Sequence, residues 1–205
     1  MDGVLVDTMP HHNRSWELLA EQEGLRLELQ HLESLRGLGR RDSLLTLLNG
    51  QVLPEVQVQH LLAEKNRLFL DLVGEVGPED LLPGVGPLLD EARAAGVPLG
   101  LASSSRNARP LCRHLGIRPF FQAFADGTDV ARGKPAPDLY VRVVNALGVP
   151  AEHCLVLEDG AAGVKAARAA GCRVVGLGPL ERLGEADAVL ESLEHATLGG
   201  LFALL

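Results

Sequence analysis

The chain has 205 residues, 46% of them apolar and 22% charged, which is typical of a globular protein and not of a disordered one. Its net charge of −8 argues against nonspecific binding to nucleic acid or to anionic membrane surfaces. No apolar run approaches the roughly 18 residues that span a bilayer, and the acidic start does not have the pattern of a signal peptide. We therefore expect a cytoplasmic protein whose cysteines are reduced and buried: Cys112, Cys154 and Cys172.

The first third of the chain has a helical pattern and no convincing strand. Amphipathic runs predict helices over residues 15–24, 29–35, 42–48 and 56–73. Gly24 is expected to end the first helix, and Asp42 is expected to be the N-cap of the third.

From residue 82 onward, short apolar segments alternate with helical ones. Strands are predicted over 97–102, 123–125, 154–157, 173–176 and 188–190, and helices over 86–95, 107–115, 138–147 and 161–170. This alternation predicts an α/β fold with a parallel sheet covered on both faces. We expect a Rossmann-like core formed by residues 1–10 and 81–205, and an inserted helical cap formed by residues 11–80.

Polar residues follow several of the predicted strands, where ligands bind in such folds. The serines at 103–105 stand at a helix start, which is either an anion site or an ordinary cap. Two prolines that follow Lys134 restrict the backbone there. Lys134 is either a residue that binds phosphate through its charge or a solvated loop lysine. Glu158 and Asp159 suit Mg²⁺, or Asp159 is a helix N-cap.

Asp2 and Gly3 stand where a first strand would end. An acid, a hydroxyl, a lysine and an acid pair, each after a strand, together describe metal-assisted phosphoryl transfer. Residues 2–8, 102–105, 133–138 and 157–159 resemble the four motifs of the haloacid dehalogenase-like superfamily, and within it the β-phosphoglucomutase-like subfamily. The resemblance implies Mg²⁺ as cofactor, a small sugar phosphate as partner and a monomer.

The resemblance also implies roles for residues of the core. Asp2 would be the general acid/base, with its backbone carbonyl on Mg²⁺, and Glu158 and Asp159 would complete the metal site. Ser103 and Lys134 would hold the oxygens of the transferring phosphoryl group.

In the cap, the resemblance assigns His12 to contact with the general acid/base, Arg40 to the distal phosphate and Lys65 to the sugar. Trp16 is either cap core or a substrate contact, and Arg40 could instead be solvated. Arg106 stands where the family has lysine, which keeps the charge but changes its geometry. The further substrate contacts implied by the resemblance are Gly37, Ser43, Ser105, Arg106 and Asn107.

The nucleophilic aspartate of the family would stand two positions before Asp2, which is outside this sequence. We expect the natural polypeptide to begin about ten residues earlier, so as to include that aspartate and the apolar strand that carries it. The mass of the native protein tests this expectation.

The resemblance implies a mutase that interconverts β-glucose 1-phosphate and glucose 6-phosphate through an aspartyl-phosphate. His12, Arg40 and Lys65 together favour this reading. One alternative is a phosphatase of small phosphosugars on the same scaffold, which differs in whether the closed cap excludes water. The other is a non-catalytic phosphate-binding relative that has no nucleophile.

Overall fold

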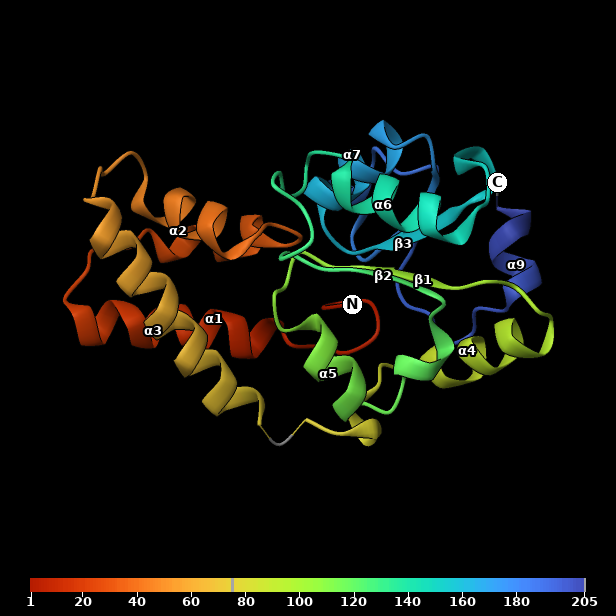
Figure 1. The fold of residues 1–205 in the computed structure, drawn as a ribbon, viewed down its shortest axis with the longest axis horizontal. Helices are drawn as coiled ribbons and strands as arrows, with labels where there is room; N and C mark the ends of the chain where they lie inside the picture. Colours follow the sequence, from red (N-terminus) through yellow and green to blue (C-terminus); the bar gives the residue numbers. More distant parts are fainter. Residues whose placement is uncertain (75, 205) are drawn as a thin grey trace.

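The computed structural model describes residues 1–74 and 76–204, which form a helical cap beside an α/β core (Figure 1). The cap contains α1 (Met9–Glu23), the 3₁₀ helix η1 (Leu29–Leu35), α2 (Arg40–Leu48) and α3 (Glu55–Val73). The apolar faces of these helices pack into a cluster of their own, whose largest fully buried members are Leu19, Leu44, Leu47 and Leu61. This cluster is separate from those of the core, which agrees with the predicted insertion; the exact domain bounds stay a prediction.

Two helix starts in the cap differ from the sequence prediction. Helix α1 begins at Met9 and not at residue 15, because Pro10 occupies its first turn, where a missing N–H costs nothing. The N-cap of α2 is Gly39, so the prediction of Asp42 as N-cap was wrong. Ser43 donates its N–H to the Gly39 carbonyl at 2.9 Å, which places the first turn ahead of Asp42. Asp42 lies within that turn, where an acid still favours the helix.

The core alternates helices with short parallel strands, as predicted. The strands are, in chain order, β1 (Gly100–Ala102), β2 (Ala123–Ala125), β3 (Leu155–Glu158), β4 (Arg173–Leu177) and β5 (Ala188–Leu190). The helices are α4 (Val85–Ala94), α5 (Ala108–His114), α6 (Asp138–Leu147), α7 (Ala161–Ala169), α8 (Leu180–Leu183) and α9 (Leu198–Ala203), and the 3₁₀ helices are η2 (Pro78–Asp80), η3 (Arg118–Phe120) and η4 (Ala151–His153).

The strands form two parallel sheets. In one, β1 pairs with β2, with Gly100 opposite Ala123; in the other, the order is β3–β4–β5. Strand β1 begins three residues later than predicted, because the N–H of Leu99 is taken by the Gln122 side chain at 2.7 Å. Helix α6 packs on β1 and β2, α7 packs on β3 and β4, and α4 and α5 lie on the other side (Figure 1).

An apolar cavity of about 320 Å³ lies between the two sheets. Residues 99–102 of the β1 segment and 154–157 of the β3 segment line it, together with apolar side chains of α4, α6 and α9. In the described part of the chain, β1 is paired only with β2 and β3 only with β4, so the edges beside this cavity have no strand partner.

The carboxyl ends of β1 and β3 point towards the cap, which places the residues that follow them at the boundary between the two parts (Figure 1). Cys112 and Cys172 are free and buried as expected, whereas Cys154 is only half-buried. Among the helices of residues 1–74 and 76–204, none combines the length and apolarity that a membrane span requires.

Candidate active site

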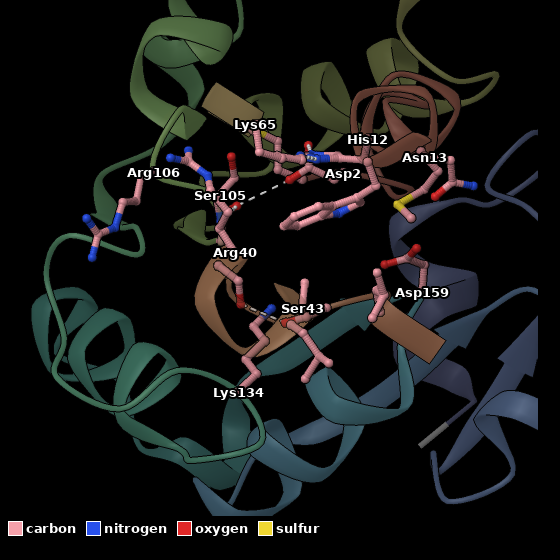
Figure 2. A pocket seen from close by; sticks show the side chains of 18 of the residues that line it. Asp2, His12, Asn13, Arg40, Ser43, Lys65, Ser105, Arg106, Lys134 and Asp159 are labelled. Atoms are coloured by element: carbon pink, nitrogen blue, oxygen red, sulfur yellow. Dashed lines mark hydrogen bonds and ion pairs between the residues drawn. The ribbon is translucent and has the colours of Figure 1, made fainter. Parts of the chain in front are cut away.

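A cavity lies where the cap meets the carboxyl ends of β1 and β3, and side chains of both parts line it (Figure 2). The labelled side chains of Asp2, His12 and Lys65 lie together, with Lys134 and Asp159 at other sides of the cavity. Asn107 lies outside this lining, directly before α5. The other predicted site residues line the cavity: Asp2, His12, Trp16, Gly37, Arg40, Ser43, Lys65, Ser103, Ser105, Arg106, Lys134, Glu158 and Asp159.

Asp2 is held as an anion in the middle of this group. Thr8 Oγ1 donates to its Oδ1 at 2.6 Å, and Ser103 Oγ donates to its Oδ2 at 3.4 Å. His12 Nε2 lies 3.9 Å from Asp2 Oδ1. Burial raises the pKa of Asp2, but the neighbouring His12 and Thr8 outweigh burial, and the net pKa lies below its usual value. Asp2 is therefore ionised in this arrangement.

Lys65 of α3 places His12 against Asp2. Lys65 Nζ lies 2.7 Å from His12 Nδ1, and the His12 ring stacks on Phe69 with 4.1 Å between ring centroids. An ammonium group can only donate, so protonated Lys65 makes Nδ1 an acceptor and leaves the imidazole proton on Nε2, facing Asp2. Burial, and then the charge of Lys65, lower the pKa of His12, which keeps the ring neutral.

Lys65 is itself unusual, because only 2% of it is exposed. Its Nζ lies 5.0 Å from the Trp16 ring centroid and 4.9 Å from that of Phe69, which are cation–π distances. Burial, and then the charge of Arg40, lower the pKa of Lys65 well below its usual value. Trp16 belongs to the buried cap cluster, as the first of its two readings predicted, and it also lines the cavity. Its contact with a substrate stays a prediction.

Ser103 and Lys134 are buried at the floor of the cavity. The N–H of Ser103 donates to the Ala125 carbonyl at 3.0 Å, and its Oγ accepts the N–H of Ser105 at 3.1 Å. Lys134 is 4% exposed and donates to Glu158 Oε1, so it is not the solvated loop lysine of the alternative reading. A fixed hydroxyl beside a fixed ammonium makes an anion site that needs no rearrangement.

Both oxygens of Glu158 already have partners. Oε1 accepts from Lys134 and from the Tyr140 hydroxyl, and Oε2 accepts the N–H groups of Asp159 and Gly160 at 3.1 and 3.3 Å. Burial raises the pKa of Glu158, but the charge and hydrogen bond of Lys134 outweigh burial and lower the pKa. Glu158 therefore orients Lys134 and the loop that carries Asp159.

Asp159 fits a metal ion better than Glu158 does. Its carboxylate lies against Gly3, where a Cβ would collide with Oδ2, so it is next to the backbone of Asp2. Burial, and then Glu158, raise the pKa of Asp159 to about 6. Arg36 Nη1 of the cap contacts Asp159 Oδ2 at 3.1 Å and supplies a positive charge there.

Carboxylate and carbonyl oxygens are the donors that Mg²⁺ prefers. The Asp159 carboxylate and the adjacent Asp2 carbonyl are such a set, so the residues fit the ion. Within residues 1–74 and 76–204, no three His, Cys, Asp or Glu side chains converge on one point. The assignment of Asp2, Glu158 and Asp159 to a metal stays a prediction.

A second cationic area lies at the cap side of the cavity. Among the described residues, neither Arg40 nor Arg106 has a carboxylate within the 4.0 Å of an ion pair. Burial, and then the charge of Arg106, lower the pKa of Arg40 to about 10. Two guanidinium groups without acidic partners form a natural site for an anion.

Gly37 and Ser43 shape the same wall. Gly37 has a φ of +80°, which favours glycine, and its carbonyl accepts the Ser104 hydroxyl at 2.7 Å, a contact from core to cap. Ser43 Oγ donates to the Gly39 carbonyl at 3.0 Å and so fixes the start of α2.

Sequence reasoning missed several supporting residues. Thr8 binds Asp2, Tyr140 binds Glu158, and Arg36 binds Asp159. Tyr140 is the one tyrosine of the sequence and is buried, and a buried hydroxyl needs a partner, which is a signal that could have been used. Arg36 gave no such signal, because its partner lies 123 positions away.

Comparisons with known proteins agree with this geometry. A family model described as haloacid dehalogenase-like hydrolase matches residues 1–171. A β-phosphoglucomutase of Bacillus subtilis (strain 168) is 36% identical, with 97% of this chain and 89% of the relative covered. Hexitol phosphatase A of Escherichia coli (strain K12) is 34% identical, with 97% and 91% covered.

The solved structures give the same result. The crystal structure of a β-phosphoglucomutase from Clostridium difficile aligns with a TM-score of 0.93 at 30% identity, with 99% of this chain and 93% of that chain covered. The fold matches over nearly the whole chain, and the chain belongs to the haloacid dehalogenase-like hydrolase family.

Proposed function

We propose that the protein transfers a phosphoryl group on a sugar phosphate, and that its reaction is the interconversion of β-glucose 1-phosphate and glucose 6-phosphate. One observation supports this most directly: two sets of basic side chains line the same cavity, and we take them as its two ends. Lys134 lies with Ser103 in the core, and Arg40 of the cap feels the charge of Arg106. A mutase must hold a reacting phosphate and a distal one together, which two such ends allow.

Asp2 is the proposed general acid/base for the sugar hydroxyl, because it lies beside Ser103 in the same cavity. His12 orients Asp2 from the cap, and Lys65 orients His12. The contacts from Lys65 through His12 to Asp2 run from the cap to the core. Asp2 is therefore oriented for proton transfer only when the cap is closed on the core.

Ser103 and Lys134 would hold the oxygens of the transferring group and stabilise the charge that develops on them. Bound Mg²⁺ would supply further charge stabilisation for that group. The Asp159 carboxylate and the Asp2 carbonyl would hold the ion. The family resemblance implies that the transferring group passes through an aspartyl-phosphate.

A phosphatase of small phosphosugars is the second candidate. Its support is the similarity to hexitol phosphatase A over 97% of the chain, which is nearly as high as the similarity to the mutase. The two activities differ in whether water or a second sugar hydroxyl receives the phosphoryl group. A phosphate-binding relative without turnover is the third candidate. A monomeric state and a cytoplasmic location stay predictions.

Product analysis separates these candidates. The protein, as its own organism makes it, is incubated with β-glucose 1-phosphate and Mg²⁺, and the products are followed by ³¹P NMR. We expect glucose 6-phosphate, and we expect chelation of the metal to stop its formation. Release of inorganic phosphate alone would make the protein a phosphatase, and the absence of any product would leave only ligand binding.

A further inference from the structure

An asparagine that does not line the cavity joins the cap to the core beside the cap-side arginines. Asn66 lies on α3, and its Oδ1 accepts a hydrogen bond of 2.6 Å from Arg40 Nη2 on α2. The same oxygen accepts a second hydrogen bond, of 2.9 Å, from Asn107 Nδ2, which directly precedes α5 of the core. One amide oxygen therefore links two cap helices to a core helix.

The chemistry of the partners fixes how the amide is turned. A guanidinium group has only donors, so the Asn66 atom that faces Arg40 must be its oxygen. Asn107 can then reach that oxygen only with its own amide nitrogen. Both hydrogen bonds therefore depend on a single acceptor, and removal of that acceptor breaks both.

The neutrality of Asn66 matters as much as its geometry. The other hydrogen bond of Arg40 goes to the Leu62 carbonyl at 3.4 Å, near the limit of such a bond. Asn66 is therefore the strongest anchor of the Arg40 guanidinium in the described part of the chain. Because it carries no charge, it holds the guanidinium without cancelling the attraction for an anion, which a carboxylate at this position would do.

We propose that Asn66 is a positioning residue that holds the Arg40 guanidinium at the boundary between cap and core and couples binding of the distal phosphate to closure of the cap. This inference rests on the proposed function, because it takes the distal group of the substrate to be a phosphate. Arg40 and Asn66 both lie in the cap, so only the Asn107–Asn66 hydrogen bond requires the cap to be closed on the core. A ligand held by Arg40 and by the core at the same time therefore favours closure.

Isothermal titration of the complete protein with two probes tests the inference. Glucose 1,6-bisphosphate has groups for both ends of the cavity, and inorganic phosphate needs only the end formed by Ser103 and Lys134. We expect Asn66→Ala to weaken bisphosphate binding by about tenfold, the effect of one charged hydrogen bond, and to leave phosphate binding unchanged. The control is Asn145→Ala, an exposed asparagine of α6, which should change neither affinity.

Asn66→Asp is a second variant, and its result separates a loss of bisphosphate binding from a folding defect. The variant keeps an acceptor for Arg40 and Asn107 but adds a negative charge beside the anion site. We expect its melting temperature to be kept and its bisphosphate affinity to fall at least as far as that of Asn66→Ala. Unchanged bisphosphate binding in Asn66→Ala, or an equal loss for both probes, would overturn the proposed role.

The hydrogen bond between Asn66 and Arg40 can also be observed without any ligand. The Arg40 Nη2–H signals in ¹H–¹⁵N NMR spectra should exchange more rapidly with solvent in Asn66→Ala than in the wild type, because Nη2 donates to Asn66, and unchanged signals would refute this contact. If the wild type does not bind the bisphosphate at all, the proposed function fails, and the NMR result still decides whether Asn66 holds Arg40.

Discussion

Lys134 and Glu158 form a buried ion pair on which both the anion site and the stability of the core depend. Truncation of Lys134 leaves the Glu158 carboxylate buried with only the Tyr140 hydroxyl and two backbone N–H groups. We expect Lys134→Ala to lower the free energy of unfolding by about 3–5 kcal/mol and to abolish turnover. Urea denaturation measures the first effect and the product assay measures the second.

Lys165 is a matched control for this substitution. It is 55% exposed at the side chain, 3.5 Å from Glu185, and its removal should change the free energy of unfolding by less than about 1 kcal/mol. A loss of stability in Lys134→Ala as small as that in Lys165→Ala would contradict the buried-pair interpretation.

Lys65 shows a conflict between stability and function. Burial lowers its pKa, so folding must bury a charge or release a proton at neutral pH, and either costs free energy. We expect Lys65→Met to raise the free energy of unfolding at pH 7 by about 0.5–2 kcal/mol while turnover falls, because His12 loses its partner. Thermal melts and the product assay measure the two changes.

The pH dependence of this gain follows from the direction of the shift. An unfolded lysine binds its proton up to about pH 10.4, whereas folded Lys65 releases it at a lower pH. The wild type therefore becomes more stable, relative to Lys65→Met, as the pH rises through this interval. An advantage of Lys65→Met that stays constant from pH 7 to pH 10, or one shared by Lys165→Met, would disprove this account.

At the scale of elements, alanine substitutions at two helical glycines are expected to change the free energy of unfolding in opposite directions. A Cβ at Gly163 of α7 would collide with the Glu158 carboxylate, whereas at Gly199 of α9 it would meet nothing within 4 Å. We expect Gly163→Ala to cost about 1–3 kcal/mol and to lower turnover by displacing Glu158 from Lys134. Gly199→Ala should instead add up to about 1 kcal/mol through helix propensity. Denaturation curves of the two variants, measured together, check the signs, and equal effects would be inconsistent with the packing around Glu158.

Most elements could be predicted from the sequence because their ends carry local signals. Gly24 ends α1 in the left-handed conformation, with φ of 59°, as its position in the pattern indicated. Helices α8 and α9 were missed because they have 4 and 6 residues, too few to show a helical period. The type of η1 was missed as well, since α and 3₁₀ helices share the same spacing over seven residues.

The candidate site could be predicted in outline because parallel strands end at the same edge of a sheet. That rule places Ser103 and Glu158 near each other from the sequence alone. It says nothing about which partner a carboxylate selects, so the enclosure of Glu158 by Lys134 and Tyr140 was not foreseen. Cap-to-core contacts such as Arg36 to Asp159 depend on how two separately packed parts meet, which no local pattern encodes.

At the scale of the whole molecule, an apolar cavity of about 320 Å³ separates the two sheets. Cavities of roughly 150 Å³ already bind benzene or xenon. We therefore expect benzene to raise the melting temperature of the 205-residue chain by at least about 2 °C.

A variant that fills the cavity controls for this effect. Ala92 of α4 is buried and lines the cavity, so Ala92→Leu should raise the melting temperature in buffer and reduce the response to benzene. No response of the wild-type chain to benzene would mean that the two sheets close on each other in solution.

The central claim is that a phosphosugar lies between cap and core with a phosphate at each cationic end of one cavity. A crystal structure of the protein with glucose 1,6-bisphosphate and Mg²⁺ tests it most directly. We predict one phosphate within hydrogen-bond distance of Ser103 Oγ and Lys134 Nζ, and the other within hydrogen-bond distance of the Arg40 guanidinium. A bisphosphate bound outside this cavity, or with both phosphates away from Lys134, would contradict the account.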